Sequence, residues 1–177
     1  AVSNGVDVVR TTADGAWELP VDDDTQIFVC KPRDHQVPLD QHNKPRFWYT
    51  HKPEGSPYEV FLFKRPPPTG DLPERIDFPL SASPEPDRFN VIVFGDPQPY
   101  NEQEMALFAR DVMSDVLASG AHETALFGIS LGDLVGDDLH LFEDLDRVQT
   151  TLGIPWYNVY GNHDMNFMSP NEEHAYE

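Results

Sequence analysis

The sequence predicts an α/β region with the order βαβαβ, preceded by a small all-β sandwich domain. Three observations lead to this fold class. Residues 1–80 hold short β-branched and aromatic runs separated by turn residues, seven prolines crowd positions 66 to 86, and from residue 90 apolar runs alternate with helical patterns. The predicted boundaries are therefore a β-sandwich over residues 1–80, a linker over 81–89, and the α/β region over 90–177.

The first part is expected to consist of strands joined by turns. Val6–Thr12 and Ala16–Val21 flank Asp14-Gly15, a dipeptide typical of hairpin turns. Further β-branched or aromatic runs predict three more strands and, among the prolines, an edge strand that returns to the first domain: Gln26–Lys31, Arg46–Tyr49, Glu59–Phe63 and Arg75–Leu80.

The second part reads as alternating strands and helices. Val91–Phe94, Leu126–Leu131 and Trp156–Tyr160 are short apolar runs, as expected for strands buried on both faces. Apolar residues recur at helical spacing over Glu102–Ser119, and Asp138–Leu152 predicts a second helix. This order implies a parallel sheet with right-handed crossovers.

Length and composition bound the function. The chain has 177 residues, of which 39% are hydrophobic and 11% aromatic, enough for folded domains with cores. No window has the 18 or more apolar residues of a spanning helix, so we expect no transmembrane segment. No signal pattern is found at Ala1, but the chain opens in what reads as the middle of a strand, so a processed or trimmed N-terminus is expected. The single cysteine, Cys30, cannot form an internal disulfide.

Negative charge is concentrated in the second part. Residues 1–90 hold ten Lys and Arg against fifteen Asp and Glu, whereas residues 91–177 hold two against sixteen. Duplex nucleic acid is therefore not expected as a partner, because a phosphate backbone has to be neutralised by basic side chains. The same excess of carboxylates suits a site that cations complete, although most of these side chains are expected to be solvated surface.

Each of the three predicted parallel strands ends in a polar cluster, and these clusters are the candidate site. They are Gly95-Asp96-Pro97-Gln98, Gly132-Asp133-Leu134-Val135-Gly136-Asp137 and Gly161-Asn162-His163-Asp164. Because the carboxyl ends of parallel strands share one edge of the sheet, these clusters are expected to meet. Oxygen and nitrogen donors around a bridging carboxylate suit a pair of hard or borderline cations, which activate water and neutralise phosphoryl oxygens. Asp137 is read as a helix-start residue and is assigned no metal.

The three clusters resemble the first three motifs of the calcineurin-like metallophosphoesterase family, whose pattern is Asp-x-His, Gly-Asp and Gly-Asn-His-Asp/Glu. The resemblance covers residues 90–177, about half of a typical catalytic domain. It implies a two-metal phosphoesterase in which Asp96 and Gln98 ligate the first metal, Asp133 bridges both, and Asn162 ligates the second. His163 would be catalytic, with Asp164 orienting and charging it.

Two departures from the family pattern modify these expectations. Gln98 stands where the commoner pattern has His, which favours Mn²⁺ or Mg²⁺ over Zn²⁺, with Fe also possible. The chain also stops at Glu177, before the segments that supply the family's remaining ligands. We therefore expect an incomplete and inactive fragment that self-associates or pairs with a missing C-terminal half.

The run VVRTTADGAWELPV, residues 8–21, resembles the N-terminal transthyretin-like domain of some bacterial members of this family. That resemblance implies a periplasmic or extracellular location. The implied substrate is a phosphate mono- or diester, as a small molecule or a lipid headgroup. Two alternatives stay open: a non-catalytic binding module that acts through the β-sandwich on a cell-surface or carbohydrate partner, and a flavodoxin-like regulatory domain.

Overall fold

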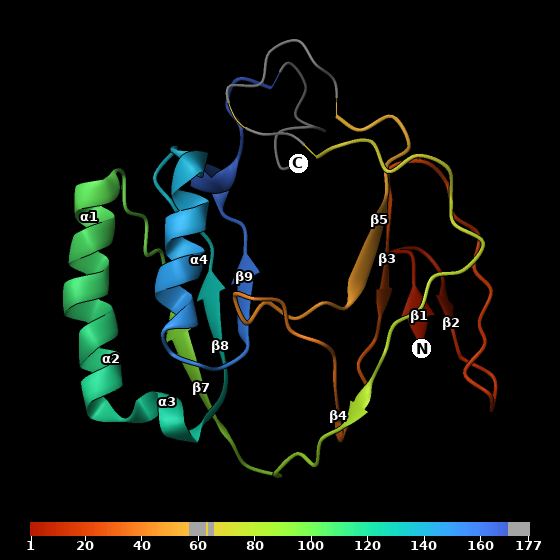
Figure 1. Ribbon diagram of the computed structural model, residues 1–177, viewed down its shortest axis with the longest axis horizontal. Coiled ribbons are helices and arrows are strands. Elements are labelled where there is room, and N and C mark those ends of the chain that lie inside the picture. Colours follow the sequence, from red (N-terminus) through yellow and green to blue (C-terminus); the bar gives the residue numbers. More distant parts are fainter. Residues whose placement is uncertain (57–62, 64–65, 170–177) are drawn as a thin grey trace. The chain divides into compact units, whose positions relative to one another are not determined.

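The computed structural model describes residues 1–56, 63 and 66–169, and it divides into two compact units (Figure 1). The first unit contains Ala1–Pro38 with residues 46–56 and 66–86. The second contains Leu39–Pro45, residue 63 and residues 87–169. The predicted strand Glu59–Phe63 falls on residues outside the described ranges, apart from Phe63 itself.

The first unit is built from two small antiparallel sheets. The larger has four strands in the order β2-β1-β3-β5, and the smaller pairs β4 with β6. Val2 and Val29 face each other across β1 and β3, and both are buried together with Ile27 and Val37. These strands are β1 (Val2–Ser3), β2 (Val8–Val9), β3 (Thr25–Val29), β4 (His35–Gln36), β5 (Trp48–His51) and β6 (Ser81–Ala82). The unit is therefore a small β domain.

The turn at Asp14-Gly15 is present, but the hairpin around it is not. Gly15 has a φ of +87°, and the Thr12 N–H donates to the Ala16 carbonyl at 2.8 Å. The predicted strand Ala16–Val21 is wrong: it contains Pro20, which lacks an N–H for a ladder, and β2 pairs with β1 instead.

The other predictions for this unit have mixed outcomes. The strand Gln26–Lys31 is confirmed as β3, and Arg46–Tyr49 overlaps β5 but begins two residues early. The edge strand Arg75–Leu80 is wrong, because this proline-flanked segment forms no ladder and β6 begins just after it. β6 thereby lies within the range assigned to the linker.

The second unit holds a parallel sheet in the order β7-β8-β9. Its strands are β7 (Asn90–Phe94), β8 (Ala125–Leu131) and β9 (Trp156–Val159), paired so that Ile129 lies opposite Val93 on one side and Tyr157 on the other. Helical segments separate the strands along the chain (Figure 1). The α/β class predicted for this part is confirmed.

A continuous helical run follows β7 and matches the extent predicted for Glu102–Ser119. It consists of α1 (Glu102–Leu107), a π-helical segment η1 (Phe108–Met113) and α2 (Ser114–Ser119). The Asn101 side chain caps its start by accepting from the Glu104 N–H at 3.0 Å. Gly120, with a φ of +69°, ends it before the short α3 (Ala121–Thr124). The π-helical segment was not predicted.

The second predicted helix is shorter than Asp138–Leu152. The side chain of Asp138 accepts from the His140 N–H and starts a 3₁₀ turn, η2 (Leu139–Leu141), and the helix α4 covers Phe142–Thr150. Leu145 on α4 is fully buried against Met105 of α1. The strand side of this core is centred on Trp156, which is fully buried with Met113 and Leu152.

A segment from the first part of the sequence, Leu39–Pro45, belongs to the second unit. The Trp156 N–H donates to the Asn43 carbonyl at 3.0 Å, which attaches the segment to the start of β9. Lys44 Nζ lies 3.0 Å from Asp146 Oδ1 on α4 and also donates to Gln149. The Asp40 carboxylate accepts from the Lys44 N–H at 2.9 Å and so closes the segment on itself.

Candidate functional site

The three polar clusters lie at the carboxyl ends of β7, β8 and β9, which are neighbours in one sheet. Asp96 follows β7, Asp133 follows β8, and Asn162 and His163 form the 3₁₀ turn η3 (Asn162–Asp164) after β9. The structure thus places the predicted residues on consecutive loops of one sheet edge.

Backbone and side-chain hydrogen bonds join the three loops. The Gln98 N–H donates to the Asp133 carbonyl at 3.0 Å, which ties the first loop to the second. Asp133 Oδ1 accepts from the His163 N–H at 3.1 Å, which ties the second loop to the third. The segment after Gln98 is held as well, because the Gly136 N–H donates to the Pro99 carbonyl at 2.9 Å.

Glycine is required where the second and third loops approach. A Cβ on Gly161 would lie 2.2 Å from Asp133 Oδ1, a distance that no real side chain tolerates. Gly136 has the same role beneath Tyr100, since its Cβ would lie 2.6 Å from the ring. The glycines therefore let the carboxylate and the ring sit against backbone.

Left-handed backbone conformations concentrate at this edge of the sheet. Among the described residues, seven non-glycine residues have a positive φ, and four of them are Asp96 at 29°, Gln98 at 42°, Asp133 at 44° and Asp137 at 69°. Aspartate adopts the left-handed backbone region at little conformational cost, but glutamine does so less readily. The loop after β7 therefore holds Gln98 in a backbone conformation that glutamine disfavours. Such strain persists where surrounding contacts impose it and is enriched at functional sites.

Gln98 uses its amide nitrogen inside the site. The Nε2 group donates to the Tyr100 hydroxyl at 3.2 Å, so the Oε1 atom is the one left to bind a ligand. The Tyr100 ring also lies edge-on to the His163 ring, with 6.2 Å between ring centres. Sequence reasoning missed Tyr100; its place two residues after Gln98 was the available signal.

The His163 ring is paired with Asp137. Its Nδ1 lies 2.7 Å from Asp137 Oδ1, which leaves Nε2 for other partners. The hydrogen bond that the His163 ring donates to Asp137 raises the pKa of His163 above its usual value, partial burial opposes this rise, and the charges of Asp137, Asp133 and Asp164 add to it. Asp137 was assigned to a helix start, yet the 3₁₀ turn η2 is capped by Asp138, and the Asp137 carboxylate contacts the histidine instead.

Asp164 has a different position from the one expected of a side chain that orients His163. It is buried, with 4% of its surface exposed, and its two oxygens accept backbone N–H groups: Val135 at 3.0 Å and Gly161 at 2.7 Å. Asp164 therefore fastens η3 to the loop after β8, and it is Asp137 that accepts the hydrogen bond from the imidazole.

The donor atoms fit a hard divalent cation. The four predicted ligands, Asp96, Gln98, Asp133 and Asn162, offer carboxylate and amide oxygens, which Mg²⁺ and Mn²⁺ accept and Zn²⁺ favours less. Within residues 1–56, 63 and 66–169, no three His, Cys, Asp or Glu side chains gather closely enough to form a metal site of those types.

The comparison with known families bears on the first part of the chain. Residues 1–66 match the family model described as "N terminal of Calcineurin-like phosphoesterase". This part of the chain is thus similar to the N-terminal domain of calcineurin-like phosphoesterases. No curated protein and no solved structure is significantly similar to it.

The match precedes, in the sequence, the three strands of the sheet that carries the candidate site. It includes β1 to β5 and the Leu39–Pro45 segment. The matched residues contain none of the three motifs, which all lie beyond residue 66. None of the described helices is both long and apolar enough to cross a membrane.

Proposed function

We propose that this calcineurin-like protein takes part in the metal-dependent hydrolysis of a phosphate mono- or diester at the carboxyl edge of β7, β8 and β9. One observation carries the proposal: the loops after three adjacent parallel strands are hydrogen-bonded to one another through Gln98, Asp133 and His163. The match of residues 1–66 to the family's N-terminal domain supports it.

In this proposal Asp96, Gln98, Asp133 and Asn162 hold two divalent cations, with Mn²⁺ preferred and Mg²⁺, Fe or Zn²⁺ as alternatives. Bound cations of this kind polarise the phosphoryl oxygens and lower the pKa of a bound water. Asp133 is suited to the central position because it lies on the middle strand and contacts the loop after β9.

His163 is the proposed acid–base group. With Nδ1 bound to Asp137, the Nε2 atom can hold or release a proton toward a substrate oxygen. The raised pKa of His163 favours the protonated ring, which donates to a leaving oxygen. Asp137 is a positioning residue, because it acts through the ring.

Calorimetric Mn²⁺ titration of the full-length protein, together with hydrolysis of an aryl phosphate monoester and diester, tests this proposal. The matched variants are Asp133→Asn, which weakens the central ligand without changing its size, and Glu123→Asn, an acidic residue of α3 outside the candidate site. We expect Asp133→Asn alone to lose metal binding and turnover. Unchanged metal affinity in Asp133→Asn would contradict the proposed centre.

The alternative is a binding module that acts through the β domain. It would be favoured if the full-length protein bound no Mn²⁺ and hydrolysed neither ester. A metal-binding protein without turnover would instead indicate a narrower substrate than the aryl esters.

A further inference from the structure

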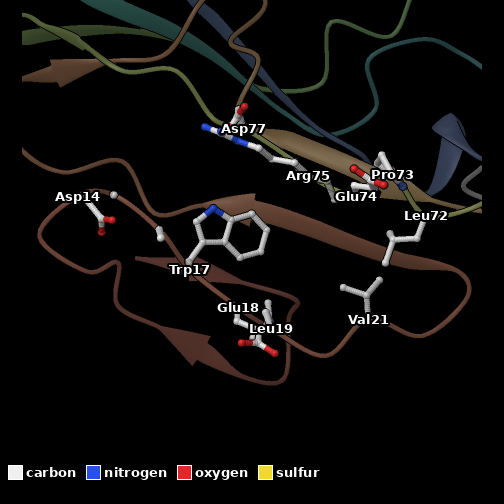
Figure 2. A pocket seen from close by; sticks show the side chains of 13 residues that line it. Asp14, Trp17, Glu18, Leu19, Val21, Leu72, Pro73, Glu74, Arg75 and Asp77 are labelled. Atoms are coloured by element: carbon white, nitrogen blue, oxygen red, sulfur yellow. The ribbon is translucent and has the colours of Figure 1, made fainter.

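The first unit has a surface cavity that the proposed hydrolase site does not use. The cavity has a volume of about 510 Å³ and lies between two segments of this unit, residues 14–21 and 72–77 (Figure 2). Neither segment belongs to a strand, so their side chains do not alternate between the two faces of a sheet.

One wall of the cavity is apolar. Figure 2 shows the Trp17 ring on one side of the opening and Val21 and Leu72 on the other. The Trp17 ring stacks on the Phe78 ring, with 6.0 Å between ring centres and 24° between ring planes. Leu72 keeps 44% of its surface exposed, so this wall is available to a ligand.

The charges of the cavity are unbalanced. Arg75 is the only basic residue in its lining, and its Nε lies 2.7 Å from Asp77 Oδ1. The Asp14 carboxylate is engaged by the Thr12 hydroxyl, which lowers the pKa of Asp14. Glu18 and Glu74 have no hydrogen bond or ion pair with any residue that the structure describes, and Figure 2 shows Glu74 beside Arg75.

We propose that this cavity binds a primary alkylammonium group, as carried by a lysine side chain or a small diamine. The alkyl stem would lie on Trp17, Val21 and Leu72, and the ammonium would meet the uncompensated Glu74. An aromatic face and a carboxylate are together the usual partners of an organic cation, and the stem accounts for the apolar wall. This binding is independent of the hydrolase proposal.

An NMR titration of the full chain tests this proposal directly. It follows the indole N–H signals of the three tryptophans. Trp156 is fully buried with its Nε1 donating to Ser130 and belongs to the second unit, so it serves as the internal reference. The probes are Nα-acetyl-lysine methylamide for the lysine side chain and cadaverine for a free diamine. Methylammonium lacks the stem, and pentanol lacks the charge.

We expect the Trp17 signal, assigned with Trp17→Phe, to move while the Trp156 signal does not, with a Kd of about 1 mM or weaker. The probe that binds more tightly identifies the source of the ammonium. Glu74→Gln should weaken binding about two- to fivefold, the range for an exposed charge pair, whereas the charge-matched Glu123→Gln should leave it unchanged.

Three results would overturn the proposal. The first is an unmoved Trp17 signal with both amine probes. The second is equal weakening by Glu74→Gln and Glu123→Gln, which would mean diffuse attraction to a chain of net charge −19. The third is equal binding of methylammonium or pentanol, which would leave the stem or the charge without a role.

Discussion

The imidazole of His163 is hydrogen-bonded to the carboxylate of Asp137, which lies 26 positions earlier in the chain. The neighbour in sequence, Asp164, is turned inward and holds two backbone N–H groups. The difference arises because η3 is a tight turn: residues 163 and 164 point in different directions from it, so adjacency in sequence does not bring their side chains together. The contact depends on where the loop after β8 lies.

Replacing Asp137 with Asn should lower the pKa of His163. This carboxylate raises the pKa of the ring. The ion pair therefore stabilises the folded state fully at pH values below the unfolded-state pKa of 6.5, and this stabilisation is lost as the pH rises through the folded-state pKa. The measurement is an NMR pH titration of the His163 Cε1 proton in metal-free protein. An unchanged midpoint would show that the 2.7 Å contact does not persist in solution.

Ser130 is a second residue whose role depends on the fold. Its hydroxyl is fully buried and accepts from Trp156 Nε1 and from Gln149 Nε2, each at 3.1 Å. Ser130→Ala should destabilise the protein by about 1–3 kcal/mol, because buried donors lose their acceptor. Chemical denaturation measures this change. The exposed Ser119→Ala serves as the control, and an equally small effect of both variants would contradict the prediction.

At the scale of elements, the Leu39–Pro45 segment is the clearest departure from the order of the sequence. It lies inside the stretch predicted as β-sandwich, but it completes the unit that holds β7, β8 and β9. Its attachment uses the N–H of Trp156 and the side chains of Asp146 and Gln149, which all come more than a hundred residues later. No local pattern marks such a docking.

Lys44→Ala should therefore destabilise the second unit although Lys44 precedes it in sequence. The variant removes the partner of Asp146 and Gln149, and a half-buried carboxylate left unpaired costs about 1–3 kcal/mol. Burial lowers the pKa of Lys44, and the charge of Asp146 opposes this shift. Thermal unfolding followed by the NMR indole N–H signal of Trp156 reports on this unit.

Arg147→Ala is the matched control for that experiment, because Arg147 pairs with Asp144 on the same helix in solvent. An exposed pair of this kind contributes about 0–1 kcal/mol. If Lys44→Ala were no more destabilising than Arg147→Ala, the docked segment would not support the second unit.

For the whole molecule, charge is the dominant property. The formal net charge is −19, and residues 91–177 hold only Arg110 and Arg147 against sixteen carboxylates. Both arginines already pair with neighbouring aspartates, Asp111 and Asp144. The remaining repulsion opposes the compact state and is screened by salt.

Raising the ionic strength to about 0.15 M, where the Debye length is about 8 Å, should raise the melting temperature of the protein by a few degrees. NaCl and KCl should act alike, because screening depends on ionic strength and not on the ion. Differential scanning calorimetry measures the shift. A fall in melting temperature would show that favourable ion pairs outweigh the repulsion.

The sequence by itself determined the α/β class, the three parallel strands, the extent of the first long helix and the three polar clusters. These follow from local patterns: apolar runs predict buried strands, helical spacing predicts helices, and glycines with acidic residues mark strand ends. The tertiary structure alone decided which carboxylate supports His163, where Leu39–Pro45 docks, and that residues 16–21 form no strand. These outcomes depend on contacts between distant residues, because ladder partners and buried ion pairs are chosen by packing and not by neighbours in sequence.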